Sequence, residues 1–137
     1  MPHDPALVAD TRAWLAKALM DLRAAEHLLQ VEPPLLGGVV FHSQQAAEKA
    51  LKAFLAWQDE PFRKTHNLEE LGRQALAFDP TLRPLVDRAV GLTPYAWQYR
   101  YPGEPAEPSL KEAEAALALA REVCEAILAR LPEEVRP

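Results

Sequence analysis

The sequence predicts an all-α protein, an up-and-down bundle of four main helices with a short additional helix. Proline is excluded from helix interiors, and the thirteen prolines leave four long stretches free of it. These stretches are rich in Ala, Leu, Glu, Lys and Arg and poor in the β-branched residues that strands prefer. Short connections between such helices favour antiparallel neighbours. The proline-free stretches are residues 6–32, 35–60, 62–79 and 109–131.

The first two helices are marked at their starts. Asp4, followed by a proline, is the expected N-cap of a helix over residues 5–30. A second helix is predicted from residue 34 to residue 58, with its apolar side chains gathered in one arc. Gly37 and Gly38 lie in its first turns. Glycine is unfavourable in a helix interior, so either this end of the helix frays or a neighbouring backbone approaches closely there, and we favour the close approach.

Two shorter helices should follow. Asn67 and Glu70 have the spacing of a capping box, which starts a third helix that ends before Asp79. Its apolar side chains are Leu68, Leu71, Ala75 and Phe78. Asp79 is itself followed by proline and repeats the start signal for a fourth element. Pro84 and Gly91 should bend or shorten that element.

The last helix has the clearest pattern. Residues 101–108 hold three prolines and a glycine, so they are expected to form an irregular loop. Ser109 and Glu112 then form a capping box, and an apolar stripe continues to Leu131. Cys124 lies on this stripe, which favours a place in the core over a reactive thiol.

Size and composition limit the classes of protein. The 137 residues are enough for a single domain over residues 1–137, and 49% apolar with 26% charged residues is typical of a folded chain. A net charge of −5 argues against non-specific binding of nucleic acid or anionic membranes. One cysteine and no run of about 18 apolar residues suit a cytoplasmic protein without a membrane span.

The second helix carries a polar arc opposite its apolar one. Gln45, Glu48, Lys49 and Lys52 fall within it. In one interpretation this arc is a solvated face, where Glu48 and Lys52 form a surface ion pair at i,i+4 spacing. In the other, Lys49 or Lys52 contributes to a polar groove or a subunit interface.

An aromatic segment lies between residues 95 and 102. Tyr95, Trp97, Tyr99 and Tyr101 are close to Arg100 in the chain. Rings beside a guanidinium can stack on bases and bind phosphates. Alternatively, Tyr95 and Tyr99 pack against the core while Arg100 pairs with a carboxylate. Both interpretations stay open.

Several kinds of site have no support in the sequence. No glycine-rich phosphate loop and no nucleophile motif occurs. The histidines are not arranged with other ligands at metal spacing. We therefore expect no metal, no cofactor and no catalytic residue. The histidines are His3, His27, His42 and His66.

Residues 41–55, 65–71 and 99–102, with Asp21 and its neighbours in the first helix, resemble the HEPN domain (higher eukaryotes and prokaryotes nucleotide-binding). The specific part is the run Gln-Gln-Ala-Ala-Glu-Lys-Ala-Leu-Lys over residues 44–52. The resemblance implies a four- or five-helix bundle that is usually a homodimer. It also implies a minimal nucleotidyltransferase as partner, in toxin–antitoxin or defence-like pairs.

Some HEPN proteins are metal-independent ribonucleases with an Arg followed four to six residues later by His. This chain departs from that pattern, because no His occurs after His66. The resemblance therefore favours a non-catalytic module that binds a nucleotide-type ligand or a nucleotidyltransferase. The two alternatives are a ribonuclease with a relocated acid/base, such as His66 acting with Arg100, and a purely structural dimeric module. The expected ligand-binding residues are Gln45, Lys49, Lys52, His66, Tyr99 and Arg100.

Overall fold

The computed structural model describes residues 3–103 and 106–137, and its regular elements there are all helical. This confirms the predicted all-α class. Three helices are long and two are short, with single 3₁₀ segments between and after them. The helices are α1 (Pro5–Gln30), α2 (Leu36–Trp57), α3 (Leu68–Leu76), α4 (Arg83–Ala89) and α5 (Leu110–Leu128). The 3₁₀ segments are η1 (Pro80–Leu82), η2 (Val90–Ala96) and η3 (Glu133–Val135).

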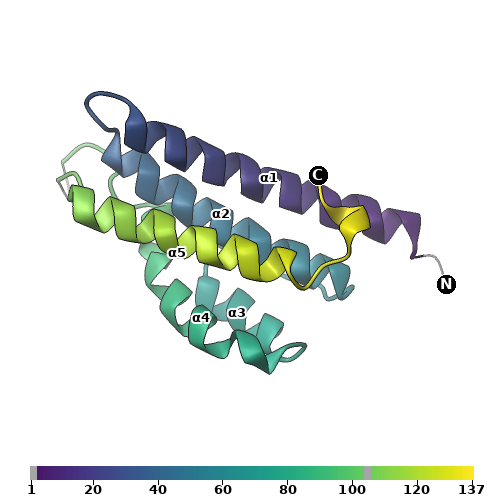
Figure 1. Cartoon of the computed structure of the whole chain (residues 1–137). Helices are drawn as coiled ribbons and strands as arrows, with labels where there is room; N and C mark the ends of the chain where they lie inside the picture. The colour runs from purple at the N-terminus through teal and green to yellow at the C-terminus, as the bar shows by residue number, and fades with distance from the viewer. Residues whose placement is uncertain (1–2, 104–105) are drawn as a thin grey trace.

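The long helices α1, α2 and α5 lie side by side, and α3 and α4 form a smaller lobe against them (Figure 1). Helix α2 contacts α1, α5, α3 and η2, so it is the central element of the fold. The apolar core lies along these contacts and contains fully buried side chains such as Leu15, Leu51, Leu55, Leu71 and Ile127. A helix with neighbours on several sides has little room for a fully solvated face.

The predicted caps are present at three helix starts. Asp4 Oδ1 accepts a hydrogen bond from the backbone N of Ala6 at 2.9 Å. Asn67 Oδ1 caps α3 by accepting from two backbone N–H groups, at 2.9 and 3.2 Å. Ser109 Oγ accepts from the backbone N of Glu112 at 3.0 Å. Each side chain satisfies backbone donors that the helix itself leaves unpaired.

Neighbouring atoms do approach the two glycines closely, but the expectation that they would be backbone atoms is wrong, because they belong to side chains. A Cβ on Gly38 would lie 2.7 Å from Leu28 Cδ1 on α1. The backbone N of Gly37 donates to Glu107 Oε2 at 2.9 Å. The absence of side chains here lets α1 and the segment before α5 pack against the start of α2.

Helix α3 ends earlier than the apolar pattern alone indicates. Phe78 was expected on the apolar face of the third helix, but α3 ends at Leu76 and Phe78 is exposed. The backbone N–H groups of Ala77 and Phe78 bond to carbonyls three residues back, which tightens the last turn and directs the chain outward. None of the described helices is long and apolar enough to cross a membrane.

Cys124 occupies the core position that the sequence predicts. Its side chain is 2% exposed, on α5. Burial, with smaller contributions from the charges of Glu125 and Asp21, raises the pKa of the thiol to about 12. The thiolate is the reactive form of cysteine, so this side chain is held in its unreactive form.

We expect Cys124 to resist thiol reagents in the native protein. With an aromatic disulfide reagent near pH 8, release of the chromophore should be slow in buffer and rapid in denaturant, because only unfolding exposes the thiol and returns its pKa towards the ordinary value. Absorbance readings with and without urea check this. Labelling at the same rate in both conditions would contradict the buried position.

Candidate functional site

The polar arc of α2 forms a face that is largely buried rather than solvated. We call it the polar face of α2. Glu48 and Lys52 are only 2% and 6% exposed. The interpretation of Glu48 and Lys52 as a surface ion pair is therefore wrong, although the i,i+4 pair itself exists. Trp14 of α1 and Phe62 cover the ammonium group of Lys52, with ring centroids 5.3 and 5.8 Å away. The face consists of Phe41, His42, Gln45, Glu48, Lys49 and Lys52.

Glu48 is the centre of one cluster on this face. Its Oε2 accepts from Lys52 Nζ at 2.8 Å, and its Oε1 accepts from the Nδ1–H of His66, also at 2.8 Å. Gln44, which is fully buried, donates to Glu48 Oε1 and to the backbone carbonyl of His66. Gln45 in turn donates to the side chain of Gln44 at 2.7 Å. The carboxylate thus fixes the ring of His66, whose side chain remains 59% exposed.

Asp21 is the centre of a second cluster. This α1 carboxylate lies 2.8 Å from Nδ1 of His42 and 2.6 Å from Nζ of Lys49. Burial by itself raises the pKa of Asp21, but the hydrogen bonds and charges of His42 and Lys49 together outweigh burial and lower it below its usual value. Buried charges are tolerated when they are paired in this way. Two carboxylates therefore organise the cations of the polar face.

The arrangement around Asp21 predicts acid sensitivity. A carboxyl whose pKa is lower in the folded than in the unfolded state stabilises the fold above the ordinary aspartate pKa of about 4, and this stabilisation is lost as the pH falls through the folded value. We expect the free energy of unfolding in urea to fall below about pH 4. The decrease should be shallower in D21N and unchanged in D10N, an exposed aspartate of the same helix. Equal slopes in D21N and the parent would contradict the role of Asp21.

Arg100 follows η2 in the chain and contacts the polar face of α2 at Phe41. Its guanidinium carbon is 4.2 Å from the centroid of the Phe41 ring, and Nη1 donates to the carbonyl of Ala96 at 3.2 Å. Within residues 3–103 and 106–137, Arg100 contacts no carboxylate. The alternative in which Arg100 pairs with a carboxylate is therefore not what the described residues show. Stacking fixes the plane of the guanidinium and leaves its other donors open.

Tyr99 lies apart from the polar face. Its ring stacks on that of Tyr95 at 6.2 Å, and the Tyr95 hydroxyl donates to Glu112. Burial, followed by this hydrogen bond, raises the pKa of Tyr95. Tyr99 also lines a pocket of about 500 Å³ with Gly37 and Glu107 at the start of α2. The two tyrosines thus pack against the core, as the structural interpretation expected.

The structure brings most of the predicted ligand-binding residues to one helix. Gln45, Lys49 and Lys52 belong to the polar face of α2, His66 joins it through Glu48, and Arg100 joins it through Phe41. Tyr99 is the residue that does not contact it in the described interactions. No group of three His, Cys, Asp or Glu side chains in the described part of the chain could hold a metal ion.

Sequence reasoning missed the roles of Asp21 and His42. A usable signal exists for Asp21, because it lies on the same stripe of α1 as Ala18 and Ala25, both of which are fully buried. A charged residue on a buried stripe requires a partner. His42 and Lys49 are two helical turns apart and so lie on the same side of α2, where they can meet one acidic residue.

The fold and site define a small helical domain whose central helix carries a buried, charged face. A comparison with protein-family models matches the HEPN domain over residues 11–131. The chain therefore belongs to the HEPN family. Neither the curated proteins nor the solved structures give a match to it.

Proposed function

We propose that this chain is a non-catalytic HEPN module that binds a nucleotide-type ligand along the polar face of α2, pairs with a minimal nucleotidyltransferase subunit, or does both. The observation that carries the proposal is Arg100, an exposed guanidinium that is stacked on Phe41 and is not neutralised by any described carboxylate. Such a group can donate to phosphate oxygens and offer its free plane to a base.

The other residues of the site have distinct parts in this proposal. Lys49 and the outer edge of His66 are partly open to solvent and would contact the ligand directly. Lys52 and Gln45 are buried and would not contact the ligand. Lys52 holds Glu48 in place, and Gln45 holds Gln44 in place. Tyr99 stacks on Tyr95 away from the polar face of α2 and has no part in this proposal.

Nucleotide binding is tested by calorimetric titration of the purified chain with ATP, GTP and cyclic nucleotides. We expect a saturable heat with at least one of them. Heat that is absent with all of them, while a nucleotidyltransferase still binds, would instead support the purely structural module. The parent titration should be repeated at raised salt, because contacts between cations and phosphate weaken as exposed charges are screened.

Self-association and pairing are proposed on the family resemblance, together with a cytoplasmic location. The exposed rings of Trp97 and Tyr101 and the exposed side chain of Leu110 provide apolar surface for such contacts. Sedimentation should show a dimer, and a strictly monomeric species at high concentration would count against it. Co-expression with a small nucleotidyltransferase from a neighbouring reading frame should yield a complex that survives gel filtration.

A metal-independent ribonuclease is the second candidate, and the geometry of His66 favours it. A carboxylate that holds Nδ1 of a histidine leaves Nε2 free to exchange a proton, as in general acid/base catalysis. However, Phe41 and Glu48, which hold Arg100 and His66, are two helical turns or about 10 Å apart along α2. That separation makes joint action on one phosphate less favourable.

RNA cleavage in the presence of a chelator tests this second candidate. If His66 is the acid/base, H66N should abolish cleavage while keeping the fold, since asparagine can still donate to Glu48 in place of Nδ1. H27N, on the exposed side of α1, is the matched control. RNA left intact by the parent protein would remove the ribonuclease candidate.

A further inference from the structure

The cluster around Asp21 joins one predicted ligand-binding residue, Lys49, to two residues that sequence reasoning assigned to no site, Asp21 and His42. Asp21 Oδ1 holds Nδ1 of His42 and Asp21 Oδ2 holds Nζ of Lys49, so one carboxylate places an imidazole and an ammonium next to each other. Asp21 itself is 9% exposed and comes from α1, whereas both of its partners come from α2. The spacing of the two nitrogens is thus fixed from a buried position.

Both partners retain hydrogen-bonding capacity. Lys49 uses one of its three donors on Asp21, and His42 is bonded through Nδ1 alone, so Nε2 is free among the described interactions. Their side chains are 31% exposed for His42 and 23% exposed for Lys49. A ligand in solvent can therefore reach these two groups, while Asp21 lies behind them.

The charges of the cluster select the kind of ligand. When the imidazole of His42 is neutral, the positive charge of Lys49 and the negative charge of Asp21 cancel each other. When His42 carries a second proton, the cluster gains a net positive charge, and an Nε2–H donor stands beside the ammonium. A phosphate group carries about −1.5 to −2 charges and three acceptor oxygens, so it can accept from both donors at once. A neutral ligand gains nothing from this charge.

We propose that His42 and Lys49 form a phosphate-binding site and that Asp21 is its positioning residue. This inference rests on the proposed function, since it assigns the phosphate of the nucleotide-type ligand to a particular pair of side chains. Asp21 does not touch the phosphate, because like charges repel. Its role is to hold the two donors at a fixed spacing, which lowers the entropy that binding would otherwise cost.

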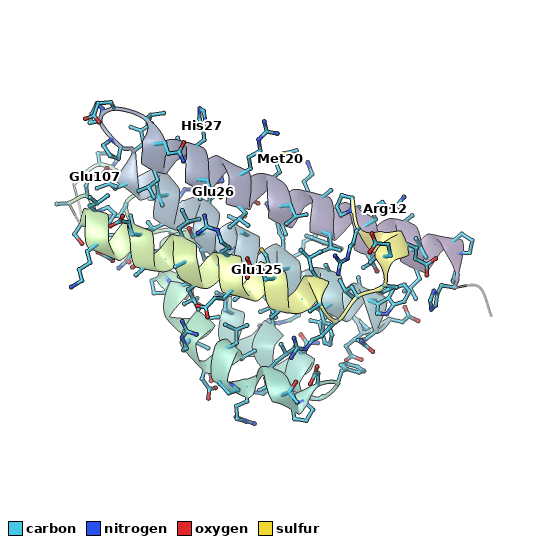
Figure 2. The ribbon with its side chains drawn as sticks, in the orientation of Figure 1. Arg12, Met20, Glu26, His27, Glu107 and Glu125 are labelled. Carbon is cyan, nitrogen blue, oxygen red and sulfur yellow. The ribbon has the colours of Figure 1, made fainter. Side chains whose placement is uncertain are left out.

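The site can be tested with inorganic phosphate alone, using proton NMR of the histidine rings. The His42 Hε1 resonance is assigned by its loss in H42N, which keeps a donor for Asp21 but removes Nε2. We expect the His42 resonance to shift saturably with phosphate, relative to chloride at equal ionic strength. His27 is the internal control, because it projects from the outer side of α1 (Figure 2). A His42 resonance that does not move, or that moves in parallel with His27, would overturn the proposal.

Variants separate this site from the proposed function as a whole. Calorimetry should compare adenosine, AMP and a short oligonucleotide on the parent, H42N and K49M. We expect both variants to lose at least tenfold in affinity for AMP and little for adenosine, with K17M, an exposed lysine of α1, unchanged. Comparison of AMP with the oligonucleotide shows whether the phosphate belongs to a free nucleotide or to a chain.

The outcomes are distinct. If AMP binds and neither H42N nor K49M weakens it, the proposed nucleotide binding holds and this site is wrong. If no nucleotide binds but the His42 resonance still responds to phosphate, the phosphate site holds and nucleotide binding is wrong. Melting curves of H42N and K49M check that each variant is folded. If K49M unfolds, the AMP affinity of H42N alone tests the phosphate site.

Discussion

Replacing Glu48 with glutamine is expected to lower the free energy of unfolding by about 3–5 kcal/mol, the usual effect of removing one partner from a buried ion pair. Lys52 would remain almost fully buried beside Trp14 and Phe62 without a counter-charge. The substitution also removes the charge that fixes the ring of His66. Its cost should therefore be far greater than the few tenths of a kcal/mol typical of a solvated i,i+4 pair.

Urea unfolding followed by circular dichroism measures this loss. E125Q is the matched control, because Glu125 is exposed on α5 and labelled in Figure 2; its effect should stay within about 0.5 kcal/mol. The double variant E48Q/K52M should recover much of the loss, since methionine keeps the apolar stem of the lysine without its charge. A loss below about 1 kcal/mol in E48Q would show that water reaches the pair.

Arg100→Ala is expected to reduce the affinity for whichever nucleotide binds by at least tenfold. A hydrogen bond to a charged group contributes about 1.5–3 kcal/mol, and a difference of about 1.4 kcal/mol is tenfold in affinity. The stability of the fold should change little, because Arg100 is exposed and its contacts among the described residues are the Phe41 ring and one carbonyl. Calorimetric titration together with a thermal melt separates these two effects.

Arg100→Lys tests the part played by the flat guanidinium. Lysine keeps the charge but lacks the plane that stacks on Phe41, so this variant should recover only part of the lost affinity. R83A is the control, because Arg83 is exposed on α4, away from α2's polar face. Unchanged binding by R100A would remove the central observation behind the proposed function.

The helices could be predicted because their signals are local. Asp4, Asn67 and Ser109 each cap the helix that follows, and the side chain and the amides it accepts from lie within three residues of each other. The gaps between prolines likewise locate the helices without reference to distant contacts. The helix ends could not all be predicted, as Phe78 shows, because i→i+3 hydrogen bonds tighten the last turn of a short helix.

The site could be predicted only in part, since periodicity shows which side chains share a face but not what covers that face. Lys49 and Lys52 were correctly placed together. The burial of Lys52 depends on Trp14 and Phe62, which come from distant parts of the chain. The same reason applies to Arg100, which lies after η2, because its partner Phe41 belongs to the distant helix α2. Contacts that depend on how helices pack leave no local pattern.

The attachment of α3 to α2 has a consequence for how the molecule opens. The residue before the α3 cap is held by Gln44 and Glu48, and the first amide of α3, that of Leu68, donates to Thr93 Oγ1 in η2. The beginning of the segment from α3 to η2 is thus bonded to α2 by these polar contacts, and the far end of the segment is bonded to its beginning. In hydrogen exchange its amides should open together as one cooperative unit, at lower free energy than those of the three long helices. A ligand bound beside Glu48 and His66 would slow that exchange across the whole segment.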